Sequence, residues 1–270
     1  MVVQHNMAAS NANRQLGIST NTLSKSTEKL SSGYRINRAA DDAAGLSISE
    51  KMRSQIRGLN KASSNAQDGI SAIQTAEGAL NEAHSILQRM NELATQSAND
   101  TNTTADRTAV QSEVNALTNE LSRIASTSQF NTQNLLDGTF TGKNLQVGAL
   151  ENQKITISIG TMNAKALGVD SLDVKSFTKA GSAMTLIQKA ISKVSGQRSD
   201  LGALQNRLEH TVNNLDNISE NTQTAESRIR DTDMVEEMVN YSKNNILAQA
   251  GQSMLAQANQ SNQGVLSLLQ

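Results

Sequence analysis

The residues with the clearest potential for chemistry are two adjacent acids, Asp41 and Asp42. Paired carboxylates can hold a metal ion or exchange protons, but no third ligand lies near them in the sequence. They directly precede Ala43-Ala44-Gly45-Leu46, so we interpret them first as acceptors for the free N–H groups at a helix start. A metal or acid–base site is the alternative interpretation.

The histidines form no catalytic motif. His5, His84 and His210 are far apart and lack the His-Glu-x-x-His spacing of zinc proteases. The chain has no Gly-x-Ser-x-Gly turn and no cysteine, which excludes disulfides, thiol nucleophiles and cysteine-bound zinc. His84 lies beside an apolar seam, where a packed or half-exposed side chain is the ordinary role. We predict that the protein is not an enzyme and needs no cofactor.

A long helix is predicted from Met52 to Ala94, because every seventh residue there is apolar. The series is Met52, Leu59, Ala66, Ile73, Leu80, Leu87 and Ala94. Polar residues fill most of the other positions, which is the pattern of a coiled-coil helix. The chain contains no proline that would interrupt it. At 1.5 Å per residue, this helix would be roughly 65 Å long.

Two further helices are predicted to cover the apolar seam of the first. One begins at Thr104 or Asp106 after the polar turn 97–102, and it should fold back antiparallel on the first helix. Its apolar seam is Val110, Val114, Leu117, Leu121 and Ile124. The other runs from about Ala183 to Ile229, with the seven-residue series Ile187, Val194, Leu201, Leu208 and Leu215.

A β-hairpin is predicted in the glycine-rich stretch between these helices. Residues 154–159 alternate apolar and polar side chains and are rich in isoleucine, which is typical of a strand. Residues 144–147 are the expected partner strand, followed by an irregular return to the last long helix.

The two ends of the chain are helical in pattern but almost free of charge. Residues 1–24 contain Arg14 as their only Lys, Arg, Asp or Glu, and residues 246–270 contain none. Ser31-Ser32-Gly33 is expected to end the first helix, with Gly33 as a left-handed cap. We hypothesise that the two terminal helices pair with each other and bury their apolar residues against further copies of the chain. The predicted assembly seam comprises Leu16, Leu23, Leu30, Leu247, Met254 and Leu268.

The expected fold is mainly α, a long antiparallel coiled-coil bundle with a small β-hairpin and with the N- and C-termini paired at one end. The expected domains are an N-terminal helix 1–33, a connector 34–45, a rod 46–229 with the hairpin near 144–160, a connector 230–235 and a C-terminal helix 236–270. Net charge is −1, so bulk attraction to nucleic acid or anionic membranes is not expected. No run of 18 apolar residues predicts a membrane span.

Several motifs resemble the terminal signatures of bacterial flagellins. The longest is Leu30-Ser-Ser-Gly-Tyr-Arg-Ile-Asn-Arg-Ala-Ala-Asp-Asp-Ala-Ala-Gly-Leu-Ser-Ile-Ser49. The others are Asn65-Ala-Gln-Asp-Gly-Ile70, Gln74-Thr-Ala-Glu-Gly-Ala-Leu-Asn81, Ser227-Arg-Ile-Arg-Asp-Thr-Asp233, Met254-Leu-Ala-Gln-Ala-Asn-Gln260 and Val265-Leu-Ser-Leu-Leu269. The resemblance covers residues 1 to about 150 and 183–270, so the outer surface domains of longer members are expected to be missing.

This resemblance implies a structural subunit that polymerises into the flagellar filament for motility. It implies terminal helices in an inner tube and long helices in an outer tube. The implied partners are other copies of the chain, an export chaperone on the C-terminal helix, and the filament cap and hook-junction proteins. Secretion to the extracellular filament without a cleaved signal peptide is also implied, and the first residues lack the basic and apolar regions of such a signal.

The resemblance further implies that animal toll-like receptor 5 is a partner. The family's contact pattern is present as Leu87-Gln-Arg-Met-Asn-Glu-Leu-Ala94. The contacts carried over are Gln88, Arg89 and Leu93, with Glu113 on the returning helix. Asn91 and Thr95 depart from the residues common in the family. The alternative is that these polar residues form a solvated face that packs between subunits.

Two rival functions have different expectations. A hook–filament junction protein has similar ends, but it would form about one ring instead of thousands of copies. An unrelated coiled-coil adhesin would not require charge-free ends.

Overall fold

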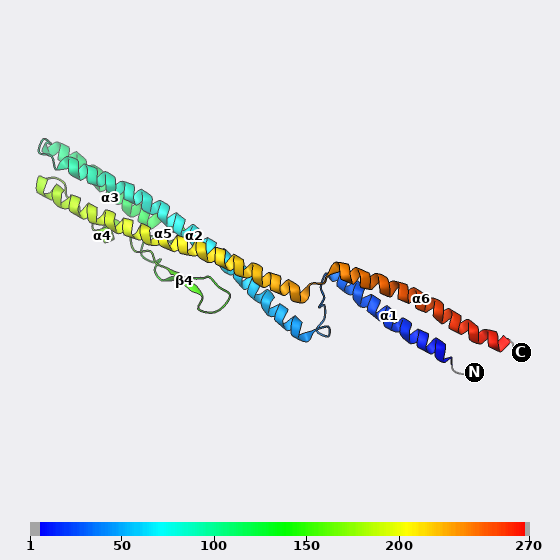
Figure 1. Cartoon of the computed structure of the whole chain (residues 1–270). Coiled ribbons are helices and arrows are strands. Elements are labelled where there is room, and N and C mark those ends of the chain that lie inside the picture. Colours follow the sequence, from blue (N-terminus) through cyan, green and yellow to red (C-terminus); the bar gives the residue numbers. More distant parts are fainter. Residues whose placement is uncertain (1–5, 268–270) are drawn as a thin grey trace. The chain divides into compact units, whose positions relative to one another are not determined.

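The structure is a computed structural model that describes residues 6–267, with side chains as far as Ser261 (Figure 1). Helices dominate it, and its strands are short. The elements, in order, are α1 Met7–Ser32, α2 Ala43–Ser97, α3 Thr104–Thr127, β1 Gln129–Phe130, β2 Gln133–Asn134, β3 Lys143–Gln146, β4 Lys154–Ile157, α4 Ala164–Leu167, α5 Phe177–Arg230 and α6 Met234–Ser267. The predicted mainly α fold with antiparallel long helices and a small hairpin is confirmed. No helix within residues 6–267 has both the length and the apolar content that crossing a membrane requires.

The chain forms two compact units. Unit 1 contains residues 1–54 and 221–270, and unit 2 contains residues 55–220. Helices α2 and α5 therefore contribute residues to both units. The divisions fall at Ser54 and Glu220, inside these helices, whereas the sequence analysis placed them at the connectors 34–45 and 230–235.

Unit 2 is a bundle of α2, α3 and α5 with a closed apolar core. Apart from the half-buried Met52, the predicted heptad residues of α2 and α5 are buried. Leu80 and Leu87 on α2, and Leu201 and Leu208 on α5, have an exposed fraction of 0%. The predicted seam of α3 also lies in this core, since Val114 and Leu121 are fully buried.

Polar contacts set the register of α2 against α5. The Ser63 hydroxyl donates to Asp216 (3.0 Å), and the Ser219 hydroxyl donates to Asn60 (2.7 Å). The order of these pairs along the two helices shows that they run antiparallel.

The helix starts follow from capping chemistry. Thr103 and Asp106 form a reciprocal capping box at the start of α3: the Asp106 N–H donates to the Thr103 hydroxyl (3.3 Å), and the Thr103 N–H donates to the Asp106 carboxylate (2.9 Å). At the other end of the chain, Gly33 has φ 75° and closes α1 as the predicted left-handed cap.

The predicted hairpin is confirmed as β3 and β4, which pair antiparallel with Leu145 opposite Ile155. The alternation of β4 buries Ile155 and Ile157 against the helices. A second hairpin, β1 and β2, was not predicted. Its strands are two residues long and carry too few apolar residues to show a period, and its turn uses positive φ at Asn131 and Thr132.

Unit 1 is built on the antiparallel pair α1 and α6. Lys29 approaches Glu237 (3.7 Å) near one end of the pair, and the Asn6 amide donates to the Ala258 carbonyl (2.9 Å) near the other. This pair is thinly packed. Among its described side chains, only Ser26, Glu237 and Ala248 are buried.

α2 begins at Ala43, directly after Asp42, as the capping interpretation expected, whereas α5 and α6 begin before the predicted residues 183 and 236. α5 begins at Phe177, before the expected Ala183, since Ala180 already lies in the core of unit 2. α6 begins at Met234, where Asp233 accepts from the N–H groups of Val235 and Glu236 (2.9 and 3.2 Å).

Candidate functional site

The adjacent acids are capping groups. The Asp42 carboxylate accepts from the Gly45 N–H (2.8 Å) at the start of α2, which confirms the capping interpretation. The Asp41 carboxylate instead accepts hydrogen bonds within the connector, from the backbone N–H groups of Arg38 (2.9 Å) and Asn37 (3.2 Å). The bond from the Arg38 backbone is the main reason why the pKa of Asp41 is lowered. In the described part of the chain, no three His, Cys, Asp or Glu side chains are grouped as metal ligands.

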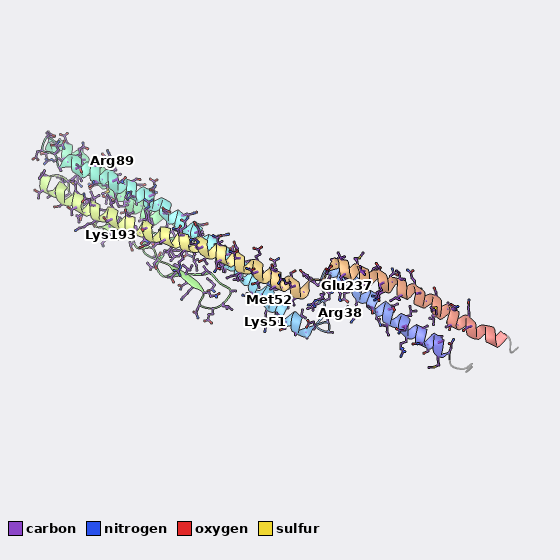
Figure 2. All side chains as sticks on the ribbon, in the orientation of Figure 1. Arg38, Lys51, Met52, Arg89, Lys193 and Glu237 are labelled. Carbon is purple, nitrogen blue, oxygen red and sulfur yellow. The ribbon has the colours of Figure 1, made fainter. Side chains whose placement is uncertain are left out.

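A polar cluster lies on the outer surface of unit 2, centred on Arg89 of α2 (Figure 2). The Arg89 guanidinium donates twice to Glu113 on α3, from Nε (3.1 Å) and Nη2 (2.9 Å). Its Nη1 donates to Glu92 (3.1 Å). These bonds, first of all those to Glu113, raise the pKa of Arg89. The cluster therefore presents a guanidinium fixed between two carboxylates.

Three of the four predicted receptor contacts share this exposed surface. Gln88, Arg89 and Glu113 are exposed, and the Gln88 amide nitrogen lies 3.1 Å from Nε2 of the half-buried His84. Leu93 differs, because its exposed fraction is 1% and it belongs to the core of unit 2. The resemblance implied that Leu93 lies on the outer face of the long helices, whereas the structure places its side chain in the core of unit 2; its role in receptor binding stays a prediction. The local motif did not reveal that its side chain turns inward, three residues after the core residue Met90.

The predicted assembly seam separates into two groups. Leu16, Leu23 and Leu30 of α1 are half-buried, and Leu16 lies close to Gly251 of α6. Leu247 and Met254 are uncovered, with exposed fractions of 46% and 61%. Leu268 lies outside the described residues.

A larger apolar surface at the start of α6 was not predicted from the sequence. We call it the α6 strip, and it comprises Met234, Val235, Met238, Val239 and Ile246. Their exposed fractions are 46, 76, 52, 64 and 66%. The pairs Met234–Met238 and Val235–Val239 have the i, i+4 spacing of one helix face, a signal that was readable from the sequence. The spacing was overlooked because the acids Asp233, Glu236 and Glu237 lie between and beside these apolar residues in the sequence.

The connectors of unit 1 are tied together by contacts that sequence reasoning also missed. The Arg35 N–H donates to the Arg230 carbonyl (2.7 Å), and the Thr232 N–H donates to the Gly33 carbonyl (3.0 Å). The Arg230 guanidinium donates to Glu50 (3.0 Å) and lies over the Tyr34 ring, 4.6 Å from its centre. These bonds join the end of α1 to the start of α6 and so position the α1–α6 pair.

Comparisons with known proteins agree with these features. A family model described as bacterial flagellin N-terminal helical region matches residues 3–141, and one described as bacterial flagellin C-terminal helical region matches residues 184–269. The flagellin of Halalkalibacterium halodurans is 56% identical over 271 residues, covering 100% of each chain. The flagellar filament 33 kDa core protein of Treponema phagedenis is 52% identical over 285 residues, again covering 100% of each. The crystal structure of Bacillus cereus flagellin is 32% identical with a TM-score of 0.50, covering 56% of this chain and 88% of that one.

Proposed function

The chain belongs to the bacterial flagellin family, and we propose that it is the structural subunit of a flagellar filament, assembled through its terminal helix pair. The observation that carries this proposal is the exposed α6 strip on an otherwise weakly charged helix pair. Monomeric proteins seldom leave several large apolar side chains exposed together unless they bind something. Burial of each large aliphatic side chain contributes about 1.5–3 kcal/mol.

We expect other copies of the chain to cover the α6 strip. Glu236, Glu237 and Lys243 lie within or beside the strip, whereas α6 beyond Lys243 carries no charge and α1 before Lys25 carries only Arg14. Copies can therefore pack along those adjoining stretches without burying unpaired charges. A heterologous contact of this kind, repeated without closure, produces a helical polymer.

Elongation of filament seeds by purified protein tests this function. We expect the unmodified chain to form long tubes that are visible by electron microscopy. Val239→Asp should abolish elongation, because a carboxylate in the strip would be buried without a partner. Phe177→Asp is the matched control: Phe177 is similarly exposed (60%) but lies in unit 2. Equal elongation by both variants would contradict the role of the strip, and a single ring without tubes would favour the hook–filament junction function.

We infer that the same filament is extracellular and that the chain reaches it through export without a cleaved signal. The resemblance to flagellins supports this. An intact mass of the assembled protein that retains the first residues is the expected result. The cap and hook-junction proteins are proposed partners at the filament ends.

An export chaperone is proposed to bind α6 before assembly, when the α6 strip is still uncovered. Chaperone binding should survive deletion of residues 1–33 and be lost on deletion of residues 236–270. The reverse pattern would place the chaperone on α1.

We also propose that toll-like receptor 5 binds this protein at the surface around Arg89, with Gln88, Arg89 and Glu113 as contacts. The exposed, preorganised guanidinium supports this, because a planar Arg fixed by two carboxylates is a common centre of binding energy. Arg89→Ala should weaken receptor binding by about tenfold or more. Arg123→Ala is the control, since Arg123 is equally exposed and pairs with Glu120 on α3. Equal losses in the two variants would indicate a general charge effect.

A further inference from the structure

The described methionines differ in exposure between the two units, with Met52 and Met184 half-buried. Met90 and Met162, both in unit 2, have exposed fractions of 0% and 8%. Among the described residues, every methionine that is more than a third exposed lies in α1 or α6: Met7 (74%), Met234 (46%), Met238 (52%) and Met254 (61%). The chain has no cysteine, so all of its sulfur atoms are methionine thioethers.

Met234 and Met238 occupy a distinctive position among the exposed methionines. They lie one helical turn apart in the α6 strip, next to Val235 and Val239. Flexible, polarisable thioethers pack well at apolar contacts. In the monomer, however, an oxidant in water reaches both of them.

We propose that Met234 and Met238 are modification sites through which a peroxide blocks assembly of the subunit. The thioether sulfur donates an electron pair to one peroxide oxygen, and the O–O bond breaks. An S–O bond forms, and the proton on the transferred oxygen passes to the departing hydroxide, which leaves as water, so sulfur is oxidised and hydrogen peroxide is reduced. The product, methionine sulfoxide, is polar and chiral.

The consequence follows from the packing of the strip and rests on the proposed function. A sulfoxide oxygen buried in an apolar contact without a hydrogen-bond donor is unfavourable, so each modified residue should slow elongation by about tenfold. Met90 and Met162 in the core of unit 2 should not be oxidised, because they are shielded from the solvent. Once copies have assembled, the strip is covered and the same thioethers are protected.

Peroxide treatment of the monomer before addition of filament seeds tests the proposal. We expect sulfoxide at Met234 and Met238 by peptide mass spectrometry, unchanged helical circular dichroism, and about tenfold or greater loss of elongation. The double variant M234L/M238L, compared with its own untreated rate, should lose less elongation on treatment than the unmodified chain, because only Met254 of the assembly surface can still be oxidised. The matched variant M7L/M254L should remain sensitive, because it retains both strip methionines. Reduction of the treated protein by methionine sulfoxide reductase should restore elongation.

The outcomes separate this proposal from the function on which it rests. Failure of the untreated chain to elongate seeds would contradict the filament function itself. Normal elongation by protein with verified sulfoxide at both sites would overturn the oxidation proposal and leave the filament function intact. Equal peroxide reactivity of Met234 and Met238 in monomer and in tubes would also overturn it, because it would show that the strip is not covered.

Discussion

Asp41 and Asp42 are adjacent in the sequence, yet each serves a different segment. Asp42 caps α2, and Asp41 accepts from the backbone of the connector before it. Their types and positions predicted N–H acceptance, but the division of roles depends on how the connector turns. For Leu93 the sequence was misleading: the motif that contains it resembles a surface contact, but the tertiary fold buries its side chain.

The capping box of α3 leads to a prediction at a single residue. Thr103→Ala removes the hydroxyl that bonds both the N–H and the carboxylate of Asp106, so it should lower the free energy of unfolding by about 1 kcal/mol. Thr101→Ala is the control, because Thr101 uses only its backbone N–H in a hydrogen bond, to Asn99. Urea denaturation measures both variants, and equal stabilities would contradict the prediction.

The stability that this capping box contributes depends on pH. The bonds from the Thr103 hydroxyl, and then from its backbone, lower the pKa of Asp106 in the folded chain. A lowered pKa stabilises the fold above the ordinary pKa of aspartate, and this contribution is lost as the pH falls through the lowered value. The difference between the unmodified chain and Thr103→Ala should therefore be largest near neutral pH and shrink in acid. A difference that grows in acid would be inconsistent with this mechanism.

At the scale of elements, heptad spacing predicted the long helices and their buried faces. Capping and glycine chemistry predicted where α1 ends and where α3 begins. The β1–β2 hairpin escaped prediction, since two-residue strands have no measurable period. Its position depends on contacts with the helices, where Phe130 packs against the core of unit 2.

Two glycines of α2 provide a paired prediction on how the β3–β4 hairpin docks. A Cβ at Gly58 would lie 2.8 Å from the Cβ of Ala149 in the hairpin turn, whereas a Cβ at Gly78 would meet nothing within 4 Å. Gly78→Ala should raise stability by about 0.5–1 kcal/mol through helix propensity. Gly58→Ala should forfeit that gain and shift the turn, which amide chemical shifts of residues 148–153 would report. A stability gain of the same size at both positions would argue against close docking at Gly58.

For the whole molecule, the two units differ in how much they bury. Unit 2 contains a continuous apolar core, whereas α1 and α6 together bury only Ser26, Glu237 and Ala248 among their described side chains. Helices with so little burial gain little from tertiary packing, and isolated helices are marginal in water.

Hydrogen exchange of the monomer should reflect this difference. Amides of α1 and α6 are expected to exchange much faster than those of α2 and α5 near Leu80 and Leu201, whose side chains are fully buried. Assembly into tubes should slow exchange in α1 and α6 and change the core of unit 2 little. Slow exchange of both terminal helices in the monomer would contradict the view that they need neighbouring copies.

The sequence alone determined the helical class, the heptad faces, the main hairpin, the caps and the resemblance to flagellins, because these depend on local spacing and local hydrogen bonds. It did not determine which helix covers which face, so it placed Leu93 outside and overlooked the α6 strip. Burial depends on residues distant in the sequence, such as those of α1 that cover one side of α6 and leave Val239 exposed. Only the tertiary structure brings those residues together, and it alone distinguishes an apolar stripe that is already covered from one that remains available for another copy.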